Sequence, residues 1–540
     1  MASDLGGPDL PAGGERDHAA ALRPVLLWGP PGVGKSTVAS RVAASMGRDA
    51  VDLDAELERS LGASIPEIFA TRGEPAFREA ERAAVRAVLE REDGPIVALG
   101  GGALVDPAVR DEALERGVVV TLTARLDVLV ARLAGVRNRP LLGVEDDARA
   151  ARMSRLLSDR RSAYEVGAAR LEVSDALLDD VVARVLAAAQ DRFVRVSDPS
   201  FVRFSRDGLA AARDLVRALD ASRVLVVTDE TVRALYGDRI VNTLDQTTDA
   251  LIAVPPGEGT KRLARVEELA DAFAARGADR RSVVVAIGGG VVTDLAGFAA
   301  SVFMRGLRWI AIPTTTLGMV DAAIGGKTAV DLGARKNLVG SFHMPLSTIV
   351  DVGFARTESA RARASGFAEA LKSLAIGDRA GFEEFERAPR GDEDAWRRAI
   401  ERGAIVKARV VREDPMEHGV RATLNFGHTL GHALEAHGGL ERWMHGEAVA
   451  LGMVAAVRLG VALRVTPPSV ADRLVRALGR VGLPTALARS DVEGAAPFLR
   501  ADKKRDRDAV RFVLLEELGR CTARRLSFDE LERLLPQVCG

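Results

Sequence analysis

A glycine-rich loop near the start of the chain most constrains its fold. The apolar run RPVLLW (23–28) leads directly into GPPGVGKST (29–37), and an alanine-rich amphipathic stretch follows. This order predicts strand, loop and helix, which is the context that a P-loop requires. Glycines let backbone N–H groups close around phosphates, Lys35 reaches the β and γ oxygens, and Ser36 holds Mg²⁺. We therefore predict an α/β nucleotide-binding unit with a parallel sheet.

Length and composition indicate several globular domains. The chain has 540 residues, of which 47% are hydrophobic, with 75 basic and 76 acidic side chains. At roughly 100–200 residues per domain, three or four domains are expected. The balanced charge predicts neither nucleic-acid nor membrane binding. With only two cysteines, Cys521 and Cys539, no run of about 18 apolar residues and no signal-peptide pattern, we expect a cytoplasmic protein.

Carboxylates, glycines and arginines follow the P-loop. Asp52 and Asp54 end a second β-like run, where side chains two apart point to opposite sides and should serve different partners, although a helix N-cap would explain one of them. A later strand runs into three glycines, where bare backbone lets a ligand approach. Guanidinium groups that suit carboxylates and phosphates are frequent, although surface arginines are common in this composition. These positions are Gly100, Gly101, Gly102, Arg78, Arg137, Arg139, Arg160 and Arg161.

The order of these motifs resembles shikimate kinase. GPPGVGKST, VDLDAELE, IFATRGEPAFR, LGGGA, RPLL and R-x-x-x-Y follow one another along residues 22–188. The resemblance implies phosphoryl transfer from ATP with Mg²⁺, catalysed by positioning and charge neutralisation. It implies that the nucleotide contacts Gly32, Gly34, Lys35, Ser36, Thr37 and Arg132, and that Ser36 and Asp52 bind Mg²⁺. It implies that shikimate contacts Asp54, Arg78, Gly101, Gly102 and Arg160. Arg139 would belong to a lid over the site, and Asp54 would orient or deprotonate the attacking hydroxyl. The alternative is a nucleotide sensor without transfer activity.

Changes in pattern suggest the domain boundaries. We expect a disordered tail over 1–21, the P-loop unit over 22–192, an α/β unit over 193–353 and a mostly helical unit over 354–540. The linker near residue 193 is very short, so the units on either side should lie close together without necessarily touching.

The second α/β pattern again predicts a parallel sheet that binds a nucleotide at the carboxyl ends of its strands. One β-like run ends at Asp229, and another ends at Gly288-Gly289-Gly290 before a helix expected from Asp294. The three glycines are not the usual dinucleotide fingerprint, and a tight turn would also explain them. Glycine beside lysine then recurs, which suits an anionic substrate because N–H groups and ammonium charge act together. The residues concerned are Lys327, Lys336 and Asn337.

Four of the seven histidines fall within residues 425–447, namely His428, His432, His437 and His445. His428 and His432 are four apart, so on a helix they share a face and could bind one metal ion. The alternative is a pair of partly buried histidines bonded to backbone carbonyls. Glu369 and Lys372 share another helical face.

This stretch and the α/β unit before it resemble 3-dehydroquinate synthase over about residues 195–540. The motifs are GGGVVTDLAGFAA, IPTTTLGMVDAAIGGKT, FAEALK, LNFGHT-x-GHA and HGEAV. The resemblance implies Zn²⁺ or Co²⁺ bound by Glu369, His428 and His445, with His432 turned to the substrate and His437 on the surface. It implies NAD contacts from Asp229, Glu258, Lys261, Gly288, Gly289, Gly290, Asp294, Thr314 and Thr315.

The implied substrate is 3-deoxy-D-arabino-heptulosonate 7-phosphate. Its phosphate would meet Lys327, Lys336, Asn337 and either Lys503 or Lys504, with Arg305 offered by the second subunit of a homodimer. Its remaining groups would meet Asp321, Lys372, Lys407, Glu417, Arg421, Asn425 and His432, and Lys327, Lys372, Lys407, Glu417, Asn425 and His432 would take part in the reaction. Ala322 and Ala323 replace small hydroxyl residues, and a different sugar-phosphate cyclase is the alternative.

Overall fold

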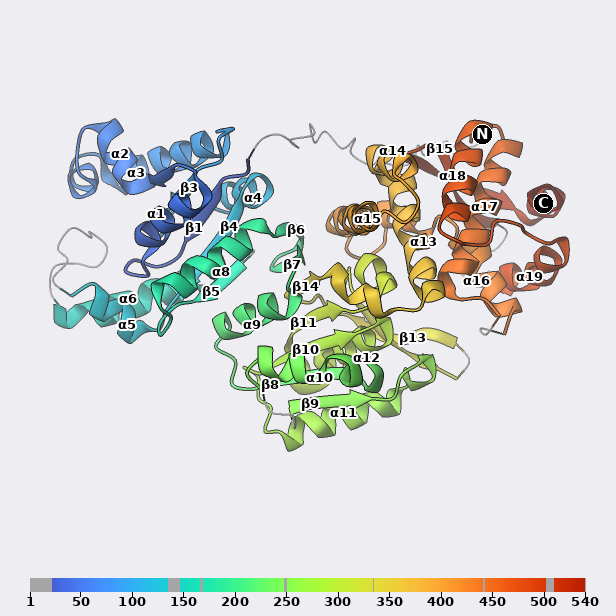
Figure 1. Ribbon diagram of the computed structural model, residues 1–540, viewed down its shortest axis with the longest axis horizontal. Helices are drawn as coiled ribbons and strands as arrows, with labels where there is room; N and C mark the ends of the chain where they lie inside the picture. Colours follow the sequence, from blue (N-terminus) through green and yellow to red (C-terminus); the bar gives the residue numbers. More distant parts are fainter. Residues whose placement is uncertain are drawn as a thin grey trace.

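The computed structural model describes residues 22–134, 146–165, 169–246, 250–333, 335–439, 442–501 and 509–539. Figure 1 shows three regions: the N-terminal unit in blue and teal, a green sheet domain, and an orange and red helical domain. The predicted α/β class is confirmed, with two parallel sheets followed by helices.

The N-terminal unit is a five-stranded parallel sheet in the order β2-β3-β1-β4-β5. Apolar side chains of β1 alternate between two cores, one on each face of the sheet. Helix α3 contains the non-helical residue Gly73 (φ 78°), which bends it next to Pro75. The elements are β1 (Val25–Trp28), α1 (Lys35–Met46), β2 (Ala50–Asp52), α2 (Leu53–Leu61), α3 (Ile65–Leu89), β3 (Ile96–Ala98), α4 (Pro107–Arg116), β4 (Val118–Thr123), α5 (Leu126–Arg132), α6 (Asp146–Asp159), α7 (Arg161–Glu165), β5 (Ala169–Glu172) and α8 (Leu178–Gln190).

The second sheet has seven strands in the order β6-β7-β14-β11-β10-β8-β9, parallel except for the antiparallel pair β6–β7. A separate hairpin, β12–β13, leaves this sheet. The elements are β6 (Arg192–Ser197), β7 (Ser200–Phe204), α9 (Gly208–Ala218), β8 (Val224–Asp229), α10 (Glu230–Thr243), β9 (Leu251–Val254), α11 (Leu263–Ala275), β10 (Val283–Gly288), α12 (Gly290–Val302), β11 (Arg308–Pro313), β12 (Lys327–Leu332), β13 (Arg335–Phe342) and β14 (Ser347–Val350).

The C-terminal region is helical and shares one continuous core with the second sheet, so the two parts of residues 192–539 form one packed body. Its elements are α13 (Ala360–Gly377), α14 (Arg379–Arg387), α15 (Glu393–Glu413), α16 (His428–His437), α17 (His445–Ala462), α18 (Pro468–Arg480), α19 (Arg489–Ala501), β15 (Ala509–Glu517), β16 (Arg520–Ser527) and α20 (Phe528–Leu534). Among the described helices, only α17 is long and apolar enough to cross a membrane, and 72% of that window is buried in the protein, as in a core helix.

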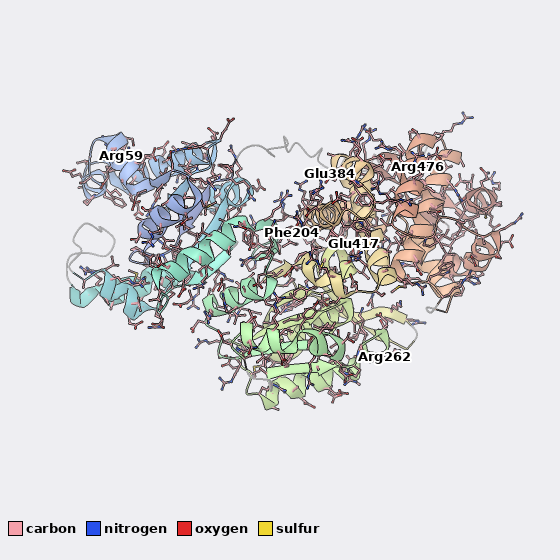
Figure 2. The ribbon with its side chains drawn as sticks, in the orientation of Figure 1. Arg59, Phe204, Arg262, Glu384, Glu417 and Arg476 are labelled. Atoms are coloured by element: carbon pink, nitrogen blue, oxygen red, sulfur yellow. The ribbon has the colours of Figure 1, made fainter. Side chains whose placement is uncertain are left out.

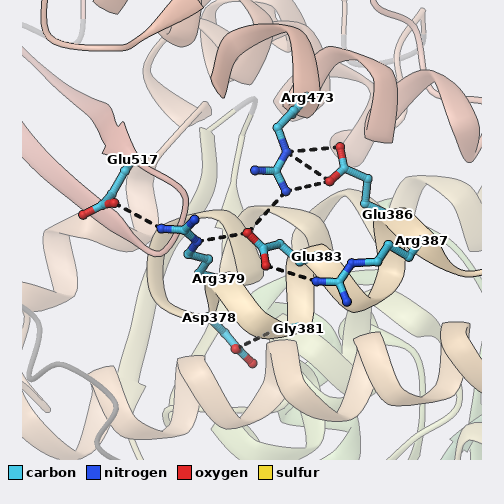
Figure 3. Close-up of polar contacts among 8 residues, drawn as sticks. All are labelled: Asp378, Arg379, Gly381, Glu383, Glu386, Arg387, Arg473 and Glu517. Atoms are coloured by element: carbon cyan, nitrogen blue, oxygen red, sulfur yellow. Dashed lines mark hydrogen bonds and ion pairs between the residues drawn. The ribbon is translucent and has the colours of Figure 1, made fainter. Parts of the chain in front are cut away.

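An ion-pair network ties the outer helices of this region together. Figure 3 shows Glu383 of α14 between Arg379, Arg387 and Arg473, with N–O distances of 3.0, 3.2 and 3.5 Å. Arg473 of α18 also reaches Glu386 at 2.6 Å. These pairs lie near solvent, so each contributes little stability, and the helices are held mainly by their shared core.

The two units are in contact. Phe193 of β6 packs into one core of the N-terminal unit and Phe201 of β7 into the other. Helix α9 packs against β5, the edge strand of the first sheet, which shields the edge from pairing with another chain. Figure 2 places Phe204 in this central region and Arg59 on the far end of the first unit. The interface fixes the two units as neighbours despite their separate sheets.

Candidate functional sites

The P-loop lies between β1 and α1. Gly34 (φ 98°) precedes the helix in the left-handed region that glycine tolerates, and a Cβ on Gly29 (φ 140°) would lie 2.2 Å from the carbonyl oxygen of Leu122. Lys35 Nζ donates to the carbonyls of Gly29 and Pro30, at 3.0 Å each. The lysine therefore lies across the loop, where it can meet phosphate oxygens.

Ser36 and Asp52, the two predicted Mg²⁺ ligands, are brought together. Ser36 Oγ donates to Asp52 Oδ2 at 2.6 Å, and Asp52 also caps α2 by accepting from the Ala55 N–H at 3.2 Å. The prediction that Asp54 belongs to an extended chain is wrong, because α2 begins at Leu53 and places Asp54 in its first turn. Helical rotation, rather than strand alternation, separates the two carboxylates.

The glycines after β3 form a wall against which three charged side chains converge. A Cβ on Gly102 would lie 2.3 Å from Arg78 Nη1, one on Gly101 3.4 Å from Arg160 Nη1, and one on Gly100 2.8 Å from Asp54 Oδ1. Bare backbone at these positions therefore lets one carboxylate and two guanidinium groups share a small space. This is the set predicted for a hydroxylated carboxylate such as shikimate.

Glu81 is a member of this wall that the sequence reasoning missed. It accepts from Arg78 Nη1 at 2.6 Å, while Glu74 accepts from Arg78 Nη2 at 3.0 Å, so the guanidinium is held from two sides. Burial raises the pKa of Glu81 although Arg78 opposes the shift. Its position three residues after Arg78 on one helix was the available signal.

The remaining predictions for the first unit are partly outside the described residues. Arg132, at the end of α5, donates to the Val33 carbonyl of the P-loop at 3.4 Å, and Thr37 lies in the first turn of α1. Arg137 and Arg139 fall within residues 135–145, and Lys503 and Lys504 within 502–508, all outside the description.

The candidate metal centre combines three helices. Glu369 of α13 faces His428 at the start of α16 and His445 at the start of α17, with Glu369 Oε1 3.5 and 3.4 Å from their Nε2 atoms. Glu369 is fully buried, and its Oε2 forms an ion pair with Lys372 Nζ at 2.5 Å, while Oε1 has no hydrogen bond among the described residues. The three donor atoms lie within 4.8 Å of one another. A buried carboxylate oxygen that faces two imidazole nitrogens without a hydrogen bond of its own fits a divalent cation of the Zn²⁺ or Co²⁺ type.

Charge in this centre is unusual. Burial alone would raise the pKa of Glu369, but Lys372, 2.5 Å away, and the two imidazoles hold it well below its usual range. Burial and the Lys372 charge lower the pKa of His428 to about 3, so this ring is neutral and able to bind a metal. Burial opposes the shift at His445, yet its contacts with Glu369 and Glu435 raise its pKa to about 10.

The helix spacing of His428 and His432 brings their rings to 5.1 Å between centroids, nearly perpendicular. However, no metal-binding group among the described residues contains both. His432 instead lies with Glu435 and His445, on the exposed side, which is where a substrate-contacting group would be. Glu435 is a second residue that sequence reasoning missed, although it stands on α16 between His432 and His437. His437 is exposed, as predicted.

The glycine loop of the second sheet precedes α12, which begins at Gly290, so the prediction that this helix begins at Asp294 is wrong. Asp294 thus lies within α12, where its carboxylate forms an ion pair with Lys261 at 2.5 Å. Lys261 also donates to Asn337 and lies 3.9 Å from Glu258. Burial raises the pKa of Asp294 to about 6 although Lys261 opposes it.

The other predicted NAD residues surround the carboxyl edge of this sheet. Gly288 ends β10 and Gly289 precedes α12, while Thr314 and Thr315 follow β11. Asp229 ends β8 and caps α10, accepting from the Val232 N–H at 2.9 Å. The structure thus gathers these side chains at one edge, with Asn337 joined to them rather than to Lys327.

Three predicted substrate residues, Lys407, Asp321 and Arg421, take part in contacts between the sheet domain and the helical domain. Lys407 of α15 donates to the Asp321 carbonyl at 2.7 Å and pairs with its carboxylate, and Arg421 donates to the Gly325 carbonyl at 3.1 Å. Both cations are buried. Asn425, three residues before His428 in the chain, is exposed.

The β12–β13 hairpin carries cations to the helical side. Lys327, at the start of β12, forms an ion pair with Glu417, and Lys336 of β13 lies 3.6 Å from Glu435. Figure 2 shows Glu417 near the centre of the molecule, between the sheet and the helices. Arg305 stands apart, exposed and in the left-handed region (φ 67°).

Three protein-family models match successive parts of the chain. Residues 31–190 match the family model for shikimate kinase, residues 251–365 that for the 3-dehydroquinate synthase N-terminal part, and residues 366–505 that for its C-terminal part. A 3-dehydroquinate synthase from Methylacidiphilum infernorum is 38% identical over 355 residues, covering 64% of this chain and 98% of that protein. One from Gloeobacter violaceus is 42% identical over 297 residues, covering 54% and 82%.

Solved structures include 2-epi-5-epi-valiolone synthase from Streptomyces hygroscopicus with NAD⁺ and Zn²⁺ bound. It is 28% identical, with a TM-score of 0.57, and the match covers 62% of this chain and 96% of that one. The C-terminal two thirds of the chain therefore share the fold of this structure.

Proposed function

Because the chain belongs to the 3-dehydroquinate synthase family and carries a shikimate kinase unit before it, we propose that one polypeptide catalyses two reactions. One is the phosphorylation of shikimate by ATP, and the other converts 3-deoxy-D-arabino-heptulosonate 7-phosphate to 3-dehydroquinate and phosphate. The observation that carries the proposal is the presence of both sets of groups: the P-loop beside Asp54, Arg78 and Arg160, and the triad of Glu369, His428 and His445.

In the kinase unit, ATP with Mg²⁺ supplies the phosphoryl group and the main positive charge. Lys35 neutralises charge on the transferring phosphate, and the Ser36–Asp52 pair is placed to hold the cation. Arg78 and Arg160 bind the shikimate carboxylate. Asp54, whose carboxylate lies beside Gly100, orients the attacking hydroxyl or accepts its proton. Its main contribution is to position the hydroxyl for the reaction.

In the synthase unit, Zn²⁺ or Co²⁺ bound by Glu369, His428 and His445 would polarise the reacting oxygen, and NAD would accept and return a hydride. The chain's own residues do the rest. Lys407 and Arg421 are rigidly held by backbone carbonyls and present charge to the substrate carboxylate. His432 and Asn425 lie on the exposed side and hold substrate hydroxyls, with His432 able to move a proton.

The substrate phosphate meets cations from the hairpin. Lys327 and Lys336 each lie beside an acid of the helical part, Glu417 and Glu435, so the hairpin bridges the two parts of the synthase. A bound phosphate would take the place of Glu417 at Lys327, and Lys336 would add a contact to it while staying beside Glu435. Arg305 faces solvent in this chain, which suits a role in the site of a second copy.

A homodimer forms through the surface around Arg305. Apolar side chains gather there: Val302, Met304, Leu338 and Phe342 are 43–52% exposed. A 2.7 Å hydrogen bond between Ser341 and Ser301 places β13 beside the end of α12. Exposed apolar patches of this kind are covered by protein partners. With Cys521 and Cys539 both free, the cytoplasm is the proposed compartment.

Paired variants test the assignment. Lys35→Ala should abolish shikimate-dependent ADP release and leave phosphate release from the heptulosonate phosphate intact, and His445→Ala should do the reverse. Shikimate-independent ATP turnover, or none, would favour a nucleotide sensor. Absence of phosphate release from the heptulosonate phosphate, with release from another heptulose phosphate, would identify a different cyclase. Loss of both activities from either variant would mean that the sites are coupled.

A further inference from the structure

His445 belongs to two groups of potential metal ligands. Glu369 and His428 form one with it, and His432 and Glu435 form the other. The two nitrogens of the imidazole face different groups: Nε2 lies 3.4 Å from Glu369 Oε1, and Nδ1 is hydrogen-bonded to Glu435 Oε2 at 3.4 Å. A histidine that binds a metal ion must be neutral and so carries its proton on only one nitrogen, and the partner of Nδ1 then decides whether Nε2 is the nitrogen free to bind the cation.

His428 shows the same arrangement. Its Nδ1 faces the Phe426 carbonyl at 3.2 Å, and its Nε2 faces Glu369 at 3.5 Å. In both rings an oxygen acceptor stands at Nδ1, and both Nε2 atoms converge on the same carboxylate. The acceptor is a backbone carbonyl at His428, which no substitution removes, whereas at His445 it is the side chain of Glu435.

Glu435 is itself held. Its side chain is 8% exposed, and its second oxygen lies 3.6 Å from Lys336 Nζ of the β12–β13 hairpin. This ammonium group disfavours a further divalent cation at His432, Glu435 and His445, because like charges at this distance repel strongly in a poorly solvated site. His432 is also exposed. The outer group is therefore better suited to orienting His445 than to binding metal.

We propose that Glu435 is a positioning residue. It accepts a hydrogen bond from the Nδ1–H group of His445 and so keeps Nε2 directed at the metal site, while Lys336 holds its other oxygen. The proposal rests on the metal centre assigned above. It adds a carboxylate–histidine–metal arrangement to one ligand and connects the metal site, through Lys336, to the hairpin that carries the phosphate-binding lysines. Outer partners of this type change metal affinity by about 10–100-fold.

Metal affinity provides the test. In chelator competition with Zn²⁺ on the full-length protein, Glu435→Ala should raise the dissociation constant about 10–100-fold. Glu435→Gln, whose amide oxygen can still accept the hydrogen bond from Nδ1–H, should raise the dissociation constant by a smaller factor. Lys336→Met should have an effect smaller than Glu435→Ala. With Co²⁺ bound, the visible absorption spectrum should change in Glu435→Ala, since ligand geometry alters.

Glu493→Gln is the matched control, because Glu493 is an exposed acid on α19 that pairs with Arg489 at 2.8 Å and lies outside the site. The circular dichroism spectrum and the thermal unfolding midpoint of each variant report that the chain, including the synthase unit, has folded. Affinity of Glu435→Ala within twofold of wild type, with an unchanged Co²⁺ spectrum, would overturn the proposal. The proposal would also be overturned if the wild-type chain bound two metal ions and Glu435→Ala bound only one, because Glu435 would then itself be a metal ligand. His428→Ala separates the two levels: if it leaves Zn²⁺ binding intact, the assigned metal centre itself is wrong.

Discussion

Arg184 of the kinase unit and Asp214 of the synthase unit form a buried ion pair, with Nε and Oδ1 3.1 Å apart and side chains 12% and 8% exposed. Arg184 also donates from Nη1 to the Glu172 carbonyl of β5 at 2.8 Å, so it ties the edge strand of the kinase sheet to α9 of the synthase. The buried charge of Arg184 in the kinase unit is therefore neutralised by Asp214 of the synthase unit.

Asp214→Ala should destabilise the full chain by about 3 kcal/mol, since it leaves a guanidinium group buried without its countercharge. Urea unfolding followed by circular dichroism measures the loss. Glu115→Ala is the control at the same interface, because its pair with Arg412, at 2.9 Å, is exposed and should contribute less than about 1 kcal/mol. Equal losses in the two variants would contradict a special role for the buried pair.

Gly102→Ala should weaken shikimate binding. The new Cβ would lie 2.3 Å from Arg78 Nη1 and must displace the guanidinium. Loss of a charge-assisted hydrogen bond of about 1.5–3 kcal/mol corresponds to a rise in KM for shikimate of roughly 10–100-fold. The KM for ATP should stay within about twofold, and synthase activity of the same sample serves as an internal control. A rise in both KM values would indicate that the P-loop had moved instead.

The buried carboxyl of Asp294 should make stability depend on pH. Because burial raises its folded pKa from 3.8 to about 6, its contribution is greatest below pH 3.8 and is lost as the pH rises towards 6. The free energy of unfolding of wild type relative to Asp294→Asn should thus fall by about 2 kcal/mol between pH 4 and pH 6.5, then stay level. Unfolding series at fixed pH values measure this difference, and a difference that does not vary with pH would contradict it.

Arg305 should act across the dimer. Arg305→Ala and His445→Ala homodimers should both have weak or no synthase activity, but a heterodimer of the two has one site with both defects and one with none. Heterodimers purified through two different tags should therefore recover about half of the wild-type activity per dimer. If Arg305 served its own subunit, each site would carry one defect and the heterodimer would stay inactive. A monomeric protein in solution would also contradict the prediction.

The chain order of motifs predicts much of the architecture. The P-loop, the strand runs into glycines and the helical histidine segment were assigned correctly from local pattern, because period and turn residues are local properties. The start of α12 and the setting of Asp54 were misjudged, since helix boundaries depend on capping and packing that pattern alone does not reveal. Glu81 and Glu435 were missed for a related reason: an acid on a helix is ordinary until its neighbours are known.

By itself, the sequence determines that the chain holds a phosphate-binding loop, a second α/β sheet of the kind that binds nucleotides, and a group of histidines. The order of its motifs identifies the shikimate kinase and 3-dehydroquinate synthase families. Only the tertiary structure decides which histidines act together. Helix spacing places His428 and His432 on one face, but a metal ion needs donor atoms that converge. Convergence requires Glu369 from another helix and the Nε2 atom of His445, a ring whose Nδ1 is hydrogen-bonded to Glu435. The same holds for the contact between the units, which exists because α9 and β5 pack together.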